Sequence, residues 1–204
     1  MSRKTKELVV EEFRRASIED AAMQAIARKG IEEVTIQDIA DEAGVAKGTV
    51  YVYFRDREEL LARTADRLFD NLIAEIEPSF CAPGGFGVRL RGLALRQLLF
   101  FDEHKALFRA TMALWQRESD PRKSRCVARY LGLLEKFFGD AVAKGDVRPD
   151  LDPFMLAAVY RDCIRGVILR RLDPNSQRLR NDAEVDAELL VSILLRGIQA
   201  GDQS

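Results

Sequence analysis

Apolar residues recur at intervals of three and four along most of the chain, which is the period of an amphipathic α-helix rather than of a β-strand. The break at residues 79–87 contains Pro83 and two adjacent glycines, a composition that does not continue a helix. An all-α fold follows. The pattern predicts helices over residues 6–29, 35–44, 47–53 and 56–78, two within 88–115, and one each over 121–145, 153–172 and 184–199.

Several of these helices carry recognisable end signals. Gly30 follows the first helix, where a residue in the left-handed conformation commonly ends a helix. Thr35 and Asp38 are spaced to cap each other's backbone donors, and Asp56 with Glu59 repeats this arrangement. Prolines 121 and 153 each follow an aspartate, which places proline at the first helical position, where its missing N–H costs nothing.

Composition narrows the functional classes. The chain has 204 residues, of which 47% are apolar and 32% charged, so it can build a sizeable core. Its net charge of −1 provides no overall positive field that would attract a polyanion.

The single histidine, His104, and the absence of metal-ligand or nucleophile–base spacings disfavour catalysis and predict no metal and no cofactor. Cys81, Cys126 and Cys163 are expected to be buried thiols. The chain has no membrane-length apolar run and no signal-type N-terminus, so we expect a cytoplasmic protein without a membrane partner.

Residues 36–54 carry the most informative spacing in the chain. A helix-turn-helix needs a small residue at the helix crossing, a glycine in the turn and apolar residues that lock the pair, and Ala40, Gly44 and Val50 have these properties. The outer side of the third helix then holds side chains whose chemistry suits a major groove. With Gly48 allowing close backbone approach and with helix starts offering N–H donors to phosphates, the predicted DNA-binding residues are Thr35, Ala46, Lys47, Gly48, Thr49, Tyr51, Tyr53 and Arg57.

This segment resembles the N-terminal domain of TetR-family transcriptional repressors. The resemblance extends from Ile18 to Leu61 and is carried by TIQDIADEAGVAKGTVYVYF and the following RDREELL. It implies a homodimeric, nine-helix regulator that binds a double-stranded operator and releases it when a small molecule enters the C-terminal domain. The expected domains are residues 1–55 for DNA binding and 56–204 for effector binding and dimerisation.

Three features depart from the family pattern. Ala46 stands where the family often has Ser or Thr, which removes a helix cap typically worth about 1 kcal/mol. Tyr53 replaces a frequent histidine and Arg57 a lysine. Residues 1–63 hold 11 basic and 13 acidic side chains, so the expected DNA-binding domain is not basic overall. Residues Arg3, Lys4 and Lys6 form an arm that either enters the minor groove or stays solvated.

The C-terminal segments carry no motif that encodes a ligand. An aromatic set around residues 100–115 either lines a cavity or forms plain core, and charged residues inside the apolar helix 153–172 pair internally, face a ligand or lie beside a dimer seam. The candidate ligand residues are Phe101, Phe108, Met112, Trp115, Arg161 and Arg165. The broad apolar faces of the last two helices predict a four-helix dimer interface through Ile164, Ile168, Leu190, Ile193 and Leu194.

The sequence therefore favours a homodimeric repressor that an unidentified effector releases from a palindromic operator. Two alternatives stay open. One is an enzyme or small-molecule carrier that merely contains a helical hairpin, and the other is a DNA-binding regulator that responds to no effector.

Overall fold

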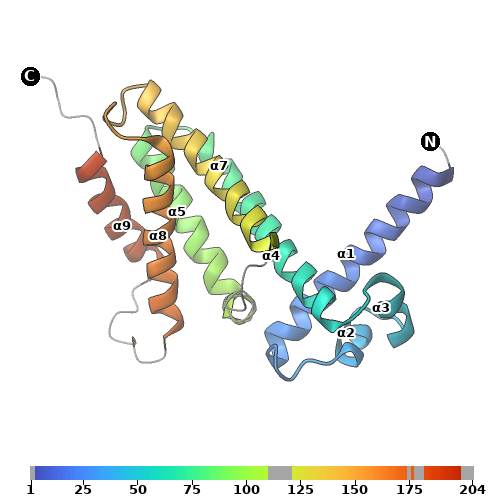
Figure 1. The fold of residues 1–204 in the computed structure, drawn as a ribbon. Helices are drawn as coiled ribbons and strands as arrows, with labels where there is room; N and C mark the ends of the chain where they lie inside the picture. The colour runs from blue at the N-terminus through green and yellow to red at the C-terminus, as the bar shows by residue number, and fades with distance from the viewer. Residues whose placement is uncertain (1–2, 110–120, 174–175, 177–181, 199–204) are drawn as a thin grey trace, which may run out of the picture. The chain divides into compact units, whose positions relative to one another are not determined.

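The regular elements of the chain are helices, as the periodicity predicts. The computed structural model describes residues 3–109, 121–173, 176 and 182–198 (Figure 1). A further helical stretch covers residues 105–109, between α5 and α7. The helices are α1 (Arg3–Lys29), α2 (Ile36–Glu42), α3 (Lys47–Tyr53), α4 (Arg57–Phe80), α5 (Phe86–Glu103), α7 (Pro121–Ala143), α8 (Pro153–Leu172) and α9 (Ala183–Ile198).

The chain forms two compact units. The N-terminal unit comprises residues 1–70 and 104–119, and the C-terminal unit comprises residues 71–103 and 120–204. Helix α4 contributes to both, because its residues up to Asp70 belong to the first unit and those from Asn71 to the second. The functional boundary between residues 55 and 56 stays a prediction, since these units describe compactness and not activity.

The N-terminal unit is built on α1, whose apolar stripe forms one wall of its core. Ala22 and Ala25 on α1, Ile39 on α2 and Leu60 on α4 are fully buried. Arg67 on α4 binds Asp20 on α1 through two hydrogen bonds of 2.6 and 2.8 Å. This bidentate pair adds a directional contact to the apolar packing between α1 and α4.

Helix ends follow the predicted signals at most positions. Gly30 has a φ of +84°, a conformation that favours glycine, and its N–H donates to the carbonyl of Ile26. Asp152 caps α8 by accepting a hydrogen bond of 2.8 Å from the N–H of Met155. The expected end of a helix at Pro78 differs from the structure, because α4 continues through this proline to Phe80. There the guanidinium of Arg89 donates to the Phe80 carbonyl, which satisfies one of the last carbonyls of the helix.

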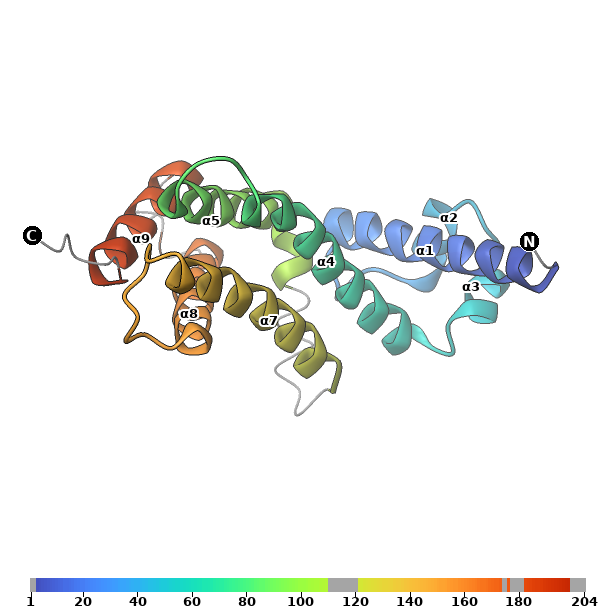
Figure 2. The same cartoon turned by 90° about the horizontal axis from the view of Figure 1, so that it is seen from above.

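The C-terminal unit is a bundle in which α7 lies beside α8 and α5 beside α9 (Figure 2). An aromatic cluster fills its interior, where the rings of Phe86, Phe137, Phe138 and Tyr160 follow one another at centroid distances of 5.3–6.1 Å. Helices α5 and α9 approach closely at Gly87, because a Cβ at this position would lie 3.1 Å from Cδ1 of Leu195. Glycine thus fixes the spacing of these two helices.

A buried ion network ties three elements of this unit together. The guanidinium of Arg171 on α8 binds the carboxylates of Asp186 on α9 and Asp102 on α5, and Arg170 also binds Asp186. The carboxylate of Asp186 is completely buried, so its charge is tolerated because two arginines face it.

The cysteines correct one sequence expectation. Cys81 is exposed and Cys163 is half-buried, and both are free thiols. Cys81 lies in the turn after α4, so its apolar residue type did not by itself ensure burial.

Candidate nucleic-acid interface

The turn between α2 and α3 is closed by backbone hydrogen bonds and one glycine. The N–H of Ala43 donates to the Ile39 carbonyl and that of Val45 to the Ala40 carbonyl, each at 2.9 Å. Gly44 stands between them with a φ of +65°, in the left-handed region that side chains with a Cβ rarely adopt. The chain thereby reverses within a few residues, and Ala40, whose carbonyl accepts from the turn, is fully buried.

Helix α3 has an inner and an outer face. Val50 and Phe54 are almost completely buried, as predicted, and hold the helix against the core. Four residues of the opposite face are exposed. They form two rows of i, i+4 neighbours that another molecule can contact. They are Lys47 with Tyr51 and Gly48 with Val52.

Sequence reasoning missed Val52, whose side chain is 77% exposed. Its position one turn after Gly48 was the available signal. Of the other predicted DNA-binding residues on this element, Ala46 is exposed and starts the helix without a side-chain cap, while Thr49 and Tyr53 are half-buried at the edges of the outer face. The assignment of these residues to DNA stays a prediction.

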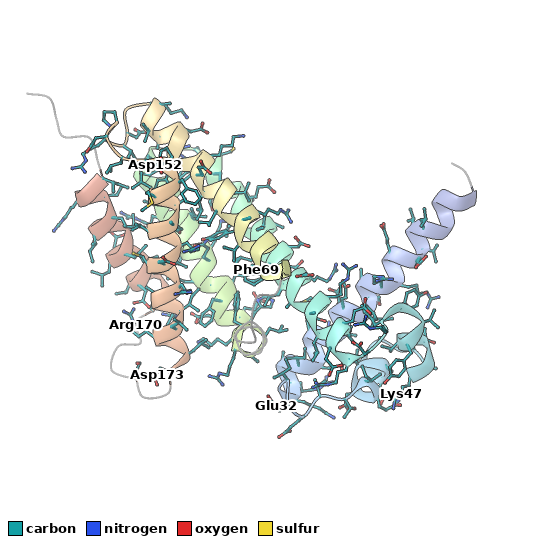
Figure 3. All side chains as sticks on the ribbon, in the orientation of Figure 1. Glu32, Lys47, Phe69, Asp152, Arg170 and Asp173 are labelled. Atoms are coloured by element: carbon teal, nitrogen blue, oxygen red, sulfur yellow. The ribbon has the colours of Figure 1, made fainter. Side chains whose placement is uncertain are left out.

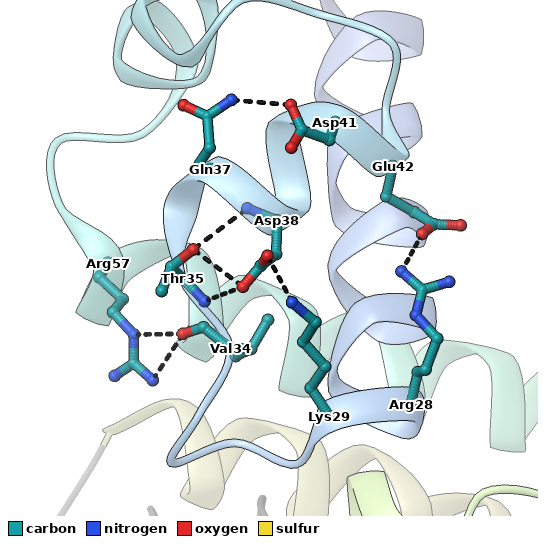
Figure 4. A network of polar contacts seen from close by, with 9 residues as sticks. All are labelled: Arg28, Lys29, Val34, Thr35, Gln37, Asp38, Asp41, Glu42 and Arg57. Atoms are coloured by element: carbon teal, nitrogen blue, oxygen red, sulfur yellow. Dashed lines mark hydrogen bonds and ion pairs between the residues drawn. The ribbon is translucent and has the colours of Figure 1, made fainter.

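Thr35 forms the predicted capping box at the start of α2 (Figure 4). Its hydroxyl accepts from the N–H of Asp38 at 3.2 Å, and the Asp38 carboxylate accepts from the N–H of Thr35 at 2.9 Å. The ammonium of Lys29 lies 2.6 Å from the other carboxylate oxygen. The hydrogen bond from Lys29, followed by those from Thr35, lowers the pKa of Asp38 from 3.8 to about 2.

Arg57, predicted to contact phosphate, has partners inside the protein. Its guanidinium donates to the carbonyl oxygens of Ile31 and Val34, in the loop between α1 and α2. Figure 4 shows the contact with Val34. These bonds fasten that loop to the first turn of α4. Arg57 therefore positions the start of α2, and its phosphate contact stays a prediction.

Several acidic side chains of the N-terminal unit form ion pairs with basic side chains that lie outside α3. Glu42 binds Arg28, Asp38 binds Lys29 and Asp20 binds Arg67. Among the described residues Lys47 has no ion-pair partner, and Figure 3 shows it at the outer edge of the unit. The local charge at the outer face of α3 is therefore positive although the domain as a whole is not.

The structure describes four of the six predicted ligand residues. Phe101 is buried in the C-terminal unit, whereas Phe108 is buried in the N-terminal unit, 6.3 Å from the ring of Phe69. Arg161 pairs with its neighbour Asp162. Arg165 is exposed on α8, and Met112 and Trp115 lie outside the described residues.

The predicted dimer residues divide between core and surface. Ile164 and Leu190 are buried within the protomer, Ile168 and Leu194 are half-buried, and Ile193 is 63% exposed. The exposed apolar row of α9 is Val185, Leu189 and Ile193, which is one residue out of register with Leu190 and Leu194.

Other kinds of site are not apparent in the part of the chain that the structure describes. No group of three or more potential metal ligands comes together among those residues. None of the described helices is both long and apolar enough to cross a membrane.

Comparison with known proteins agrees with this geometry. Residues 18–64 match the profile of the bacterial regulatory proteins of the tetR family. Residues 18–64 form a DNA-binding domain of the TetR family. The matched residues contain α2, the turn and α3, which makes this chain a DNA-binding transcriptional regulator with the outer face of α3 as the candidate reading surface.

Individual relatives differ in how much of this chain they match. An uncharacterized HTH-type transcriptional regulator of Haemophilus influenzae is 38% identical over 60 residues, which is 29% of this chain and 32% of that protein. The fatty acid metabolism regulator protein of Bacillus subtilis is 25% identical over 89% of this chain and 92% of its own. The crystal structure of the regulator FadR from Bacillus subtilis in complex with stearoyl-CoA shares the fold, with a TM-score of 0.72 and 20% identity over 90% of this chain and 99% of that one.

The capping box should titrate abnormally. Because the pKa of Asp38 is lowered to about 2, its contribution to folding is complete above pH 3.8 and is lost as the pH falls toward 2. We expect an NMR titration of the Asp38 carboxyl to give a midpoint near 2. Lys29→Met should move the midpoint up toward 3.8, while Arg28→Met, which removes the partner of Glu42, should leave it unchanged. A midpoint near 3.8 in the unmodified protein would contradict the Lys29 contact.

Proposed function

We propose that this TetR-family protein is a homodimeric repressor that binds a palindromic operator with α3 and releases it when a small molecule with an apolar group binds the C-terminal unit. The observation that carries the DNA part is the outward exposure of Lys47 and Tyr51 on a helix whose other face is locked by Val50 and Phe54. The relatives named above as regulators support a regulator over an enzyme or carrier.

In this proposal the outer face of α3 lies along the major groove. Lys47 reaches a phosphate or a guanine edge, and Tyr51 donates to phosphate or packs on a thymine methyl group. Thr49 and Tyr53 contact the walls of the groove from the edges of the face. Gly48 faces open space, since a Cβ at this position would meet no protein atom within 4 Å. Because glycine has no side chain, the helix backbone can approach DNA closely there.

Dimerisation is proposed through the exposed sides of α8 and α9. Each protomer exposes Val159 and Leu169 on α8 and Val185, Leu189 and Ile193 on α9. An apolar surface spread over two adjacent helices is buried when the same pair of a second copy packs against it. Such a two-fold symmetric dimer presents two copies of α3 to two half-sites of a palindrome.

The effector is proposed to carry an apolar group because the interior of the C-terminal unit consists of aromatic and aliphatic side chains. The relative FadR, whose structure contains stearoyl-CoA, makes long-chain acyl-CoA the first candidate class. By linkage, such a molecule releases DNA only as far as it binds the DNA-free form more tightly.

Lys47→Ala should weaken binding to promoter DNA beside the gene of this protein by about tenfold and lower the salt dependence by about one phosphate contact. The matched control is Lys136→Ala, an exposed lysine of α7, which should bind as the unmodified protein does. Fluorescence anisotropy at several salt concentrations measures both quantities. Equal salt slopes for the two variants would refute a phosphate contact by Lys47.

Gly48→Ala separates folding from DNA binding. Alanine favours a helix over glycine by about 1 kcal/mol, and its methyl group meets no atom of the protein within 4 Å, so the variant should unfold at a higher urea concentration. The same methyl group obstructs close approach to DNA and should reduce operator affinity at least tenfold. Gly132→Ala on α7, which also meets open space, should gain stability without losing affinity. If Gly48→Ala binds the operator normally, α3 does not approach DNA on this side.

Ile193→Asp places a charge in the proposed dimer interface. We expect analytical ultracentrifugation to show a monomer, because an unpaired carboxylate in an apolar contact is costly to bury. Val88→Asp, at an exposed valine of α5, serves as the control and should remain dimeric. A dimeric Ile193→Asp variant would place the interface elsewhere.

A further inference from the structure

Three polar side chains meet inside the C-terminal unit, each from a different helix. Gln97 on α5 donates to the hydroxyl oxygen of Tyr130 on α7 at 2.5 Å, and Tyr160 on α8 donates to the Gln97 carbonyl oxygen at 2.9 Å. Gln97 is 2% exposed and Tyr130 8%, while Tyr160 is fully buried. We refer to Gln97, Tyr130 and Tyr160 as the buried trio.

The buried trio has more hydrogen-bond donors than it uses. A glutamine amide carries two N–H donors and each tyrosine one O–H donor, which gives four hydrogens for the two hydrogen bonds that join the trio. Two donors therefore remain without an acceptor among the described residues, and this count holds whichever way the amide is turned. In the orientation above they are the second N–H of Gln97 and the O–H of Tyr130.

Because the unused groups of the buried trio are hydrogen-bond donors, a molecule that binds there must offer a hydrogen-bond acceptor. Burial raises the pKa of Tyr130 above its ordinary value of 10, and its hydroxyl keeps its proton at neutral pH. Two neighbouring donors suit an oxygen with two lone pairs, as in a carbonyl group. Buried donors without partners are uncommon in folded proteins, and a bound group that accepts both hydrogens would satisfy them.

The surroundings of the buried trio are apolar. One turn before or after these residues on their own helices lie Leu93 and Phe101, Leu134, and Ala157 and Ile164, all buried. The charged side chain whose field acts on Tyr130 is Arg161, which is paired with Asp162 at 2.9 Å. These neighbours favour a neutral carbonyl on an apolar body over a free carboxylate, which would need an unpaired cation.

We propose that the buried trio binds the carbonyl oxygen of the effector, and that the effector carries a neutral carbonyl on an apolar chain, as a long-chain acyl thioester does. This assignment rests on the effector-responsive function proposed above and specifies its polar contact. An oxygen bound between Gln97 of α5 and Tyr130 of α7 also changes the spacing of these two helices, so binding is coupled to the geometry of the unit.

The test compares two probes that differ only in the carbonyl group. Stearoyl-CoA carries a thioester, and S-octadecyl-CoA is its thioether analogue with the same chain and headgroup. In calorimetric titrations the unmodified protein should bind stearoyl-CoA at least tenfold more tightly, because the thioether leaves two buried donors unpaired. Tyr130→Phe should lose about tenfold in affinity for stearoyl-CoA and little for the thioether.

Ser192→Ala is the matched control, since it removes a hydroxyl of the same unit that is bonded to a carbonyl of its own helix. It should bind both probes as the unmodified protein does. Failure of stearoyl-CoA to bind, or equal losses for the two probes in Tyr130→Phe, would overturn the assignment. Operator binding is measured without any probe, so its loss or retention reports separately on the proposed function.

A measurement on the unmodified protein makes the test independent of the folding of any variant. The infrared stretch of a ¹³C-labelled thioester carbonyl falls when the oxygen accepts hydrogen bonds, so bound stearoyl-CoA should absorb at a lower frequency than in a hydrocarbon solvent. An unshifted band, or a crystal structure of the complex with water in place of the ligand oxygen beside Tyr130, would disprove the contact.

Discussion

The burial of Val50 and Phe54 is the constraint on which the recognition surface depends. Helix α3 has only seven residues, too few to be stable alone, so it persists because these two side chains anchor one of its faces. The period of the helix then dictates that Lys47, Gly48, Tyr51 and Val52 lie on the opposite side. The sharp turn at Gly44 and the loop fastened by Arg57 hold α2 in the place where α3 can pack against it.

The elements of the fold were predictable because their signals are local. The capping pair Thr35–Asp38, the turn at Gly44 and the bounds of α3 depend on residues close together in sequence, and the structure has each of them. The end of α4 was less predictable. Its extension past Pro78 depends on a contact from Arg89, which belongs to the next helix. The outer face of α3 could be derived from its two inward residues, and only Val52 was overlooked.

The C-terminal unit was harder to interpret because its helices are apolar on more than one side. In α9, Leu189 and Leu190 are identical in type, yet the first is exposed and the second buried. Periodicity fixes their relation to each other but not which of them faces α5. The buried trio could not be predicted from the sequence for a similar reason. Gln97 and Tyr130 are 33 residues apart along the chain, and Tyr130 and Tyr160 are 30 apart. Only the packing of α5, α7 and α8 brings the three side chains together.

The charges of the N-terminal unit show why net charge is a poor guide to nucleic-acid binding. Asp38, Glu42 and Asp20 are neutralised by Lys29, Arg28 and Arg67, and Asp38 is also used as a cap, so these acids act within the unit. An ion pair has almost no field at a distance of more than about a Debye length, roughly 8 Å in physiological salt. Lys47 on the outer face of α3 has no such partner among the described residues, so its charge is available to an incoming phosphate. The sum over the domain counts the paired acids at full weight, whereas DNA would meet only the charges that remain unpaired on the face it contacts.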